Sequence, residues 1–97
     1  MKRRSVVVQS EAQEEVEAIR SYQYELDPER ALRFIEAFND CLEDLGSYPA
    51  YQKRKGHYRH VMLRKLPYRV VVEVEEDTVY IYQVRHTSRK PSRKFGP

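Results

Sequence analysis

The stretch that decides the fold runs from Leu66 to Pro91 and reads LPYRVVVEVEEDTVYIYQVRHTSRKP. Its first half alternates between two faces, and one of these carries only apolar side chains, namely Tyr68, Val70, Val72 and Val74. A period of two in aromatic and β-branched residues predicts a strand, and the acidic tip at residues 75–78 predicts a turn. A second strand, apolar on both faces, follows from Val79 to Arg85. The sequence therefore predicts a β-hairpin with a basic exit, where we expect the protein to contact its target.

A third strand is predicted upstream, from His57 to Lys65. If Val61 and Leu63 face the core, then three side chains share the opposite face with Arg69 of the hairpin, namely His60, Met62 and Arg64. Pro67 cannot donate to a sheet ladder and marks a turn or an edge position before the hairpin. The sequence therefore predicts a sheet face lined by Arg and His. This prediction depends on the strand register, because a shift of one residue inverts it.

Two amphipathic helices are predicted before these strands. In the first, roughly Ser10 to Leu26, apolar side chains recur at helical spacing, namely Ala12, Val16, Ile19, Tyr22 and Leu26. Ser10 and Gln13 have the spacing of a capping box at its start. Asp27 is the predicted N-cap of the second helix and Gly46 its C-cap. The short junction between the helices predicts an antiparallel pair.

The element order completes the fold class. Ser5 to Gln9 is short and β-branched and predicts a first strand. The order is then β-α-α-β-β-β, which favours an α+β domain with an antiparallel helix hairpin packed on one face of a mainly antiparallel four-stranded sheet. A chain of 97 residues forms one domain, residues 1–97, and we expect a basic, partly irregular tail from about residue 87.

Charge is sorted along the chain more strongly than the net value of +3 suggests. Residues 10–47 sum to −8 and residues 48–97 to +8. Such asymmetry indicates a basic surface for a polyanion or an acidic partner, without deciding between them. Cys41 is the single cysteine, so we expect no disulfide and no metal-ligand set, and nothing indicates a cofactor. No apolar run approaches membrane-spanning length, and we expect a soluble cytoplasmic protein.

The segment from Pro67 to Pro91 resembles the RelE/ParE superfamily, the toxins of type II toxin–antitoxin modules that are often described as plasmid stabilisation proteins. The resemblance rests on PYR at residues 67–69, the acidic hairpin tip and the pattern V-x-H-x-x-R-x-P at residues 84–91. The two acidic helices and Tyr58-Arg59 also fit, so the resemblance covers nearly the whole chain. It implies a cognate antitoxin as partner, with either a homodimer or a toxin–antitoxin hetero-oligomer as the assembly.

The resemblance implies one of two activities. ParE-like members are most similar to this chain at residues 84–91, which implies binding and inhibition of DNA gyrase without catalysis. The residues expected to bind the target are Arg59, Arg64, Arg85, His86, Lys90 and Arg93. A basic module that binds nucleic acid without catalysis is a further alternative.

RelE-like members are metal-independent, ribosome-dependent mRNA endonucleases, and this is the other implied activity. Under it, Arg69 and Arg89 stabilise charge on the phosphate, and His60 could move a proton, as could His57 or His86. Such members carry lysines where this chain has His60 and Met62, and a tyrosine where it has Phe95. Met62 and Phe95 cannot transfer protons. We therefore place inhibition of gyrase first and the endonuclease second.

Overall fold

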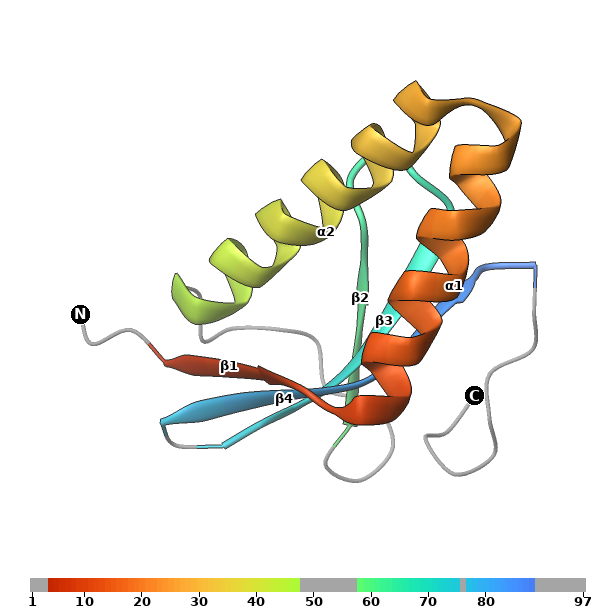
Figure 1. The fold of residues 1–97 in the computed structure, drawn as a ribbon. Helices are drawn as coiled ribbons and strands as arrows, with labels where there is room; N and C mark the ends of the chain where they lie inside the picture. The colour runs from red at the N-terminus through yellow and green to blue at the C-terminus, as the bar shows by residue number, and fades with distance from the viewer. Residues whose placement is uncertain (1–3, 48–57, 76, 89–97) are drawn as a thin grey trace.

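The computed structural model describes residues 4–47, 58–75 and 77–88 of the chain. Its elements occur in the predicted order (Figure 1). They are β1 (Ser5–Val8), α1 (Ser10–Leu26), α2 (Pro28–Ser47), β2 (Tyr58–Met62), β3 (Tyr68–Val74) and β4 (Thr78–His86).

The strands form one sheet in the order β1-β4-β3-β2, and both helices lie on the same side of it (Figure 1). The β2–β3 and β3–β4 pairs are antiparallel, whereas β1 is parallel to β4. Parallel neighbours need a long connection, and two helices and two strands separate β1 from β4 in the chain. The structure confirms the predicted α+β class with a mainly antiparallel sheet.

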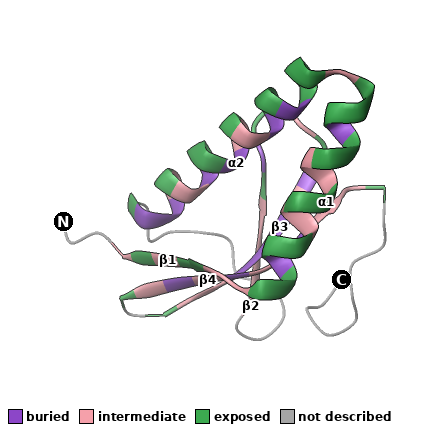
Figure 2. Ribbon diagram, viewed as in Figure 1, coloured by how far each residue is buried: buried purple, intermediate pink, exposed green. Residues whose placement is uncertain are grey.

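The core lies between the helices and the sheet (Figure 2). The predicted inner face of β3 is confirmed, because Val70 and Val72 are fully buried. Val79 and Ile81 of β4 lie beside them, and Phe34 of α2 is 1% exposed. Burying one side chain of this size stabilises a fold by about 1.5–3 kcal/mol, so this cluster fixes the helices on the sheet.

A β-bulge interrupts the pairing of β3 with β4. Val71 pairs with Gln83, but the next pair is Val72 with Ile81, so Tyr82 is an extra residue in β4. Without the bulge, Ile81 and Val84 would face opposite sides of the sheet, because side chains alternate along a strand. With it, both are buried in the core. This explains why the sequence of β4 is apolar on both faces.

The start of α1 differs from the prediction. Gln9 occupies the N-cap position and makes no side-chain capping bond, so the predicted capping box of Ser10 is wrong. Ser10 is already helical and cannot act as the cap. Gln13 instead donates through Nε2 to the carbonyl of Val8 at 3.0 Å, which ties the first turn of the helix to β1.

The two ends of α2 differ in how well the sequence predicts them. Asp27 is confirmed at the start, since its Oδ1 accepts the N–H of Glu29 at 3.0 Å. The helix continues to Ser47, so the predicted C-cap at Gly46 is wrong. The carbonyl of Gly46 accepts the N–H of Arg4 at 3.0 Å, and this bond joins the end of α2 to the start of β1.

In the second half of α1, the buried face does not coincide with the stripe of apolar residues. Tyr22 and Leu26 are 62% and 52% exposed, whereas Gln23 is 8% exposed. The predicted core positions at Tyr22 and Leu26 are therefore wrong. Gln23 lies four residues after Ile19, on the face that is turned to the sheet, and both the nitrogen and the oxygen of its amide are hydrogen-bonded there. An aromatic side chain is thereby left on the surface beside the sheet.

Candidate functional site

The sheet has a face turned away from the helices, which we call the open face. The register of β2, β3 and β4 defines two of its cross-strand rows, Met62–Arg69–Arg85 and His60–Val71–Gln83. Residues that are paired across neighbouring strands lie on the same face. Two of the residues assigned to the endonuclease alternative, His60 and Arg69, are therefore on one face and in adjacent rows.

Arg69 occupies the centre of its row and is half-buried. Within residues 4–47, 58–75 and 77–88, no acidic group lies within ion-pair distance of its guanidinium. Its cross-strand neighbours are Met62, which is 53% exposed, and Arg85, a second cation. Like charges directly opposite each other destabilise a sheet by up to ~1 kcal/mol. The arrangement does not favour folding, and no acid among the described residues neutralises the Arg69 cation.

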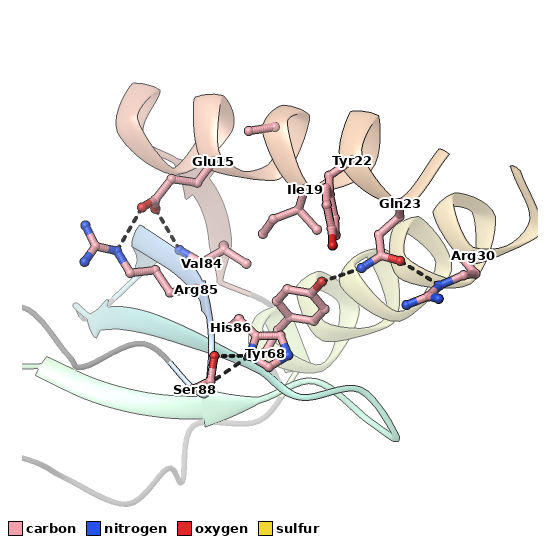
Figure 3. A pocket seen from close by; sticks show the side chains of 11 residues that line it. Glu15, Ile19, Tyr22, Gln23, Arg30, Tyr68, Val84, Arg85, His86 and Ser88 are labelled. Carbon is pink, nitrogen blue, oxygen red and sulfur yellow. Dashed lines mark hydrogen bonds and ion pairs between the residues drawn. The ribbon is translucent and has the colours of Figure 1, made fainter. Parts of the chain in front are cut away.

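Arg85 shares the row through its backbone, but its side chain is bound to α1. Nε of Arg85 donates to Oε2 of Glu15 at 3.0 Å, and the N–H of Val84 donates to Oε1 at 2.9 Å (Figure 3). The Arg85 and Glu15 side chains are 24% and 19% exposed, so water screens the pair only in part. Glu15 neutralises one predicted target-binding cation. Sequence patterns cannot single it out, because it is one of four acids in the first turns of the helix.

Two further predicted target-binding residues lie away from the open face. Arg59 pairs with the core residue Val72 and is on the helix side of the edge strand β2. Arg64 donates through Nη2 to Oδ2 of Asp44 on α2 at 3.2 Å. The prediction that Arg64 shares a face with Arg69 is wrong, because β2 ends before it and the chain turns toward α2. Three other predicted residues lie outside the described part of the chain, namely Arg89, Lys90 and Arg93.

His86 also faces the helices. It pairs with Tyr68, and the two rings meet edge to face with their centroids 5.4 Å apart. Nδ1 of His86 accepts the N–H of Ser88 at 3.1 Å. The sheet therefore separates His86 from His60, and the two histidines cannot act on one substrate group.

Beside His86 lies a hollow of about 500 Å³ between α1 and β4, which we call the α1–β4 groove (Figure 3). Its lining includes Glu15, Ile19, Tyr22, Gln23, Arg30, Tyr68, Val84 and His86. A chain of hydrogen bonds forms one wall: Nε2 of Gln23 donates to the Tyr68 phenol oxygen at 2.8 Å, and Oε1 accepts from Nε of Arg30 at 2.9 Å. Both ends of the buried amide are thus satisfied, which lets a polar residue take a core position.

Tyrosines cluster on the open face beyond His60, a feature that the strand prediction missed. The phenol of Tyr82 donates to Oε1 of Glu73 at 2.7 Å, and Tyr58 meets Tyr82 edge to face with centroids 5.6 Å apart. Burial and, next, the bond to Glu73 raise the pKa of Tyr82 to about 12. A phenol with this pKa is a poor proton donor near neutral pH. The sequence feature that could have indicated this tyrosine cluster is the Y-x-Y spacing at residues 80–82.

No group of described His, Cys, Asp or Glu side chains could hold a metal ion. Cys41 is buried in α2, and burial raises the pKa of its thiol to about 11, so the reactive thiolate is disfavoured. Neither of the two described helices has the length and apolar character required to span a bilayer.

Comparisons with known proteins agree with this architecture. The family model described as "ParE toxin of type II toxin-antitoxin system, parDE" matches residues 6–91. The chromosomal ParDE toxin–antitoxin system of P. aeruginosa is similar in structure, with a TM-score of 0.73, 18% identity, and coverage of 86% of this chain and 95% of that chain. The RelBE2 toxin–antitoxin complex of Mycobacterium tuberculosis is similar with a TM-score of 0.57, 19% identity, and coverage of 92% and 97%. No curated protein sequence gave a match.

A helix hairpin on one side of a four-stranded sheet is the fold that this chain shares with the two toxin–antitoxin structures. The family match is more specific, since it spans most of the sequence. The chain belongs to the ParE family of toxins from type II toxin–antitoxin systems.

Proposed function

We propose that this toxin binds and inhibits DNA gyrase in the cytoplasm and that a cognate antitoxin neutralises it. The observation that carries the proposal is Arg69, a cation without an acidic partner in the described segments, at the centre of the open face. A half-buried guanidinium can make several directed hydrogen bonds to carboxylates or phosphates of a target. Membership of the ParE family favours gyrase as that target.

The scatter of proton-transfer groups supports binding over catalysis. His60 is on the open face, whereas His86 is on the other side of the sheet. Tyr82 does reach the open face, but its pKa of about 12 is far from the value that suits an acid or base at neutral pH. Binding to a target requires no proton transfer, so the separation of these groups is compatible with a binding function.

The proposal of an antitoxin partner draws on the structural relatives. The two similar structures are described as a ParDE toxin–antitoxin system and a toxin–antitoxin complex. By analogy, the partner of this chain is a small antitoxin encoded beside it. Co-expression should then restore growth to cells that this toxin arrests.

A direct assay tests the target. The purified chain, added to gyrase, ATP and supercoiled plasmid, is expected to block supercoiling and to trap a complex with cleaved DNA. The same preparation should leave mRNA intact on translating ribosomes. Normal gyrase turnover at a large excess of toxin would contradict the proposal.

The mRNA endonuclease is the second candidate, because Arg69 and His60 lie in adjacent rows of one face. Under this alternative the toxin cleaves mRNA on translating ribosomes, and His60→Ala slows cleavage while Arg69→Ala abolishes it. Intact mRNA with the wild-type chain would exclude it. Unchanged cleavage by His60→Ala would remove this histidine from the reaction.

A further inference from the structure

Two glutamine side chains in the described segments are buried. Gln23 on α1 is 8% exposed and Gln83 on β4 is 4% exposed. The amide of Gln23 is bonded to Tyr68 and to Arg30. The side-chain amide of Gln83 makes no hydrogen bond to any group in the described part of the chain. The two residues therefore have similar burial but opposite states of hydrogen bonding.

The strand register places the Gln83 side chain on the open face. Gln83 pairs with Val71, which pairs in turn with His60. The next residue, Val84, is 1% exposed and belongs to the core under the helices, and successive side chains of a strand point to opposite faces. Arg69 is a diagonal neighbour of Gln83 on the open face, at the roughly 7–8 Å that is typical of such pairs. The unbonded amide and the cation without an acidic partner are thus adjacent.

Stability does not explain a glutamine at this position. A buried amide loses its hydrogen bonds to water and, without a partner in the protein, gains none in exchange. For this reason most buried polar side chains of native proteins are hydrogen-bonded. Val71 opposite is apolar and 3% exposed, so an apolar residue at position 83 would suit the free chain better. The unused hydrogen-bonding capacity of Gln83 therefore points to a group supplied by another molecule.

The amide of Gln83 is complementary to a peptide group. It offers an acceptor oxygen and two N–H donors, whereas a peptide group offers one N–H and one carbonyl oxygen. Two hydrogen bonds can therefore join them side by side. An extended segment repeats its side chains on one face about every 7 Å, which matches the spacing of diagonal neighbours such as Gln83 and Arg69. A segment that pairs with the amide can place one of its own side chains at the Arg69 guanidinium.

The charges of the open face favour a protein segment over a nucleic acid. In the described rows that pair β2, β3 and β4 on this face, the arginines and acids are Arg69, Arg85 and Glu73. Arg85 is neutralised by Glu15, and Glu73 adds an acidic side chain. A nucleic acid strand carries a negative charge at every nucleotide and requires several cations along its path. A single arginine without an acidic partner suits a single carboxylate.

We propose that Gln83 is a specificity-determining residue of the toxin, whose amide pairs with a peptide group in an extended segment of gyrase while a carboxylate of that segment binds Arg69. The long Arg69 side chain turns toward this carboxylate on docking and exposes the neighbouring amide. The inference rests on the proposed function and names the chemistry that the open face recognises in its target.

The two buried glutamines provide a matched test, because methionine has nearly the size of glutamine without its hydrogen bonds. Gln83→Met should leave the urea midpoint at or above that of the wild type, since no native hydrogen bond is lost. It should nevertheless weaken inhibition of gyrase supercoiling at least ~10-fold, as the loss of two hydrogen bonds to the target does. Gln23→Met should do the reverse. It deprives Tyr68 and Arg30 of their partner and should lower the urea midpoint, while the folded variant inhibits gyrase as the wild type does.

Binding to gyrase in the absence of DNA distinguishes a protein segment from a nucleic acid strand. Calorimetry with DNA-free gyrase should show at least ~10-fold weaker binding by Gln83→Met than by the wild type. A loss of affinity that appears only when DNA is present would overturn the protein segment in favour of a nucleic acid strand at Gln83.

The remaining outcomes separate this inference from the proposed function. A lower urea midpoint for Gln83→Met would show that the amide is bonded in the free chain, and the inference would be wrong. Full inhibition of gyrase by this variant would also overturn it, while gyrase would stand as the target. If the wild-type chain itself fails to inhibit gyrase, the proposed function falls together with the inference.

Discussion

At the scale of single residues, Arg69 carries the proposed activity. It lies on the open face with another arginine opposite and no acid in reach among the described residues. Arg69→Ala should abolish growth arrest and gyrase inhibition. It should change the free energy of unfolding by no more than ~0.5 kcal/mol, because no native ion pair is lost. Growth curves after induction, together with urea denaturation, measure both effects.

Arg64→Ala is the matched control for Arg69. It removes an arginine that is 74% exposed and bound to Asp44 on the helix side, an ion pair worth about 0–1 kcal/mol. Toxicity should persist in this variant. If Arg64→Ala abolishes growth arrest and Arg69→Ala does not, the open face is the wrong surface.

Gln23 shows at the same scale what the sequence could not predict. Apolar spacing favoured Tyr22 and Leu26 as inward residues, yet the buried side chain is a glutamine bonded to Tyr68 and Arg30. These two partners come from a strand and from the next helix, one of them 45 residues away in the chain. Helical periodicity registers apolar character only, so a polar residue that is buried through tertiary hydrogen bonds escapes it.

Tyr68→Phe tests this buried network. The variant removes the oxygen that accepts from Nε2 of Gln23 and leaves a buried donor unpaired, which should cost about 1–3 kcal/mol of unfolding free energy. The measurement is the urea midpoint at a constant slope. Tyr24→Phe, at an exposed site of α1, should leave the midpoint unchanged. An equal midpoint in the two variants would show that the amide finds another partner.

At the scale of elements, Glu15 connects α1 to β4. Its carboxylate accepts from the Val84 N–H and from Arg85, and both bonds are partly shielded from water. Glu15→Ala should lower the unfolding free energy by about 1–2 kcal/mol and speed exchange of the Val84 amide. Glu14→Ala, an exposed neighbour on the same turn, should do neither. Slow exchange at Val84 in Glu15→Ala would show that the carboxylate is not the acceptor.

The same scale shows why the elements were more predictable than their details. The hairpin was predictable because apolar and polar residues alternate along β3. This local pattern identifies Val70 and Val72 as core residues without knowledge of long-range contacts. The bulge at Tyr82 was not, because an extra residue appears only when two strands are paired. The start of α1 was mispredicted for a related reason, since Gln13 bonds to the carbonyl of Val8 in β1 rather than within a capping box.

At the scale of the whole molecule, the separation of charge along the sequence does not survive folding unchanged. The acidic helical half meets the basic half through the pairs Glu15–Arg85 and Asp44–Arg64. The open face is therefore less basic than the sum of +8 over residues 48–97 suggests. The structure places Arg69 on the predicted sheet face, but the predicted set of target-binding residues also included cations that helix acids neutralise. Composition cannot show which acid will lie beside which base.

The stability of the whole fold should decrease at alkaline pH because of the ionisation of the Cys41 thiol. Burial and, next, the nearby Asp44 charge raise the pKa of this thiol from its ordinary value of 9.0 to about 11. Above pH 9 the unfolded chain loses the thiol proton while the folded chain keeps it, so the unfolded state is stabilised. The unfolding free energy should decline from pH 9 to 11 by about 2–3 kcal/mol from this group, and then level off.

Cys41→Ala isolates that contribution, because lysines and other tyrosines titrate equally in both proteins. The variant should be the less stable protein at pH 8, where it has lost a buried sulfur, and the gap to the wild type should narrow toward pH 11. For Tyr82→Phe, the difference in unfolding free energy from the wild type should also narrow, between pH 10 and 12, since the pKa of Tyr82 is raised from 10.0 to about 12. The effect should be smaller than for Cys41→Ala, because the Tyr82 ring is half-exposed. Urea denaturation at each pH measures the difference in unfolding free energy between each variant and the wild type. Parallel stability curves for wild type and Cys41→Ala would mean that the thiol ionises equally in both states and that the core around α2 opens to water in alkali.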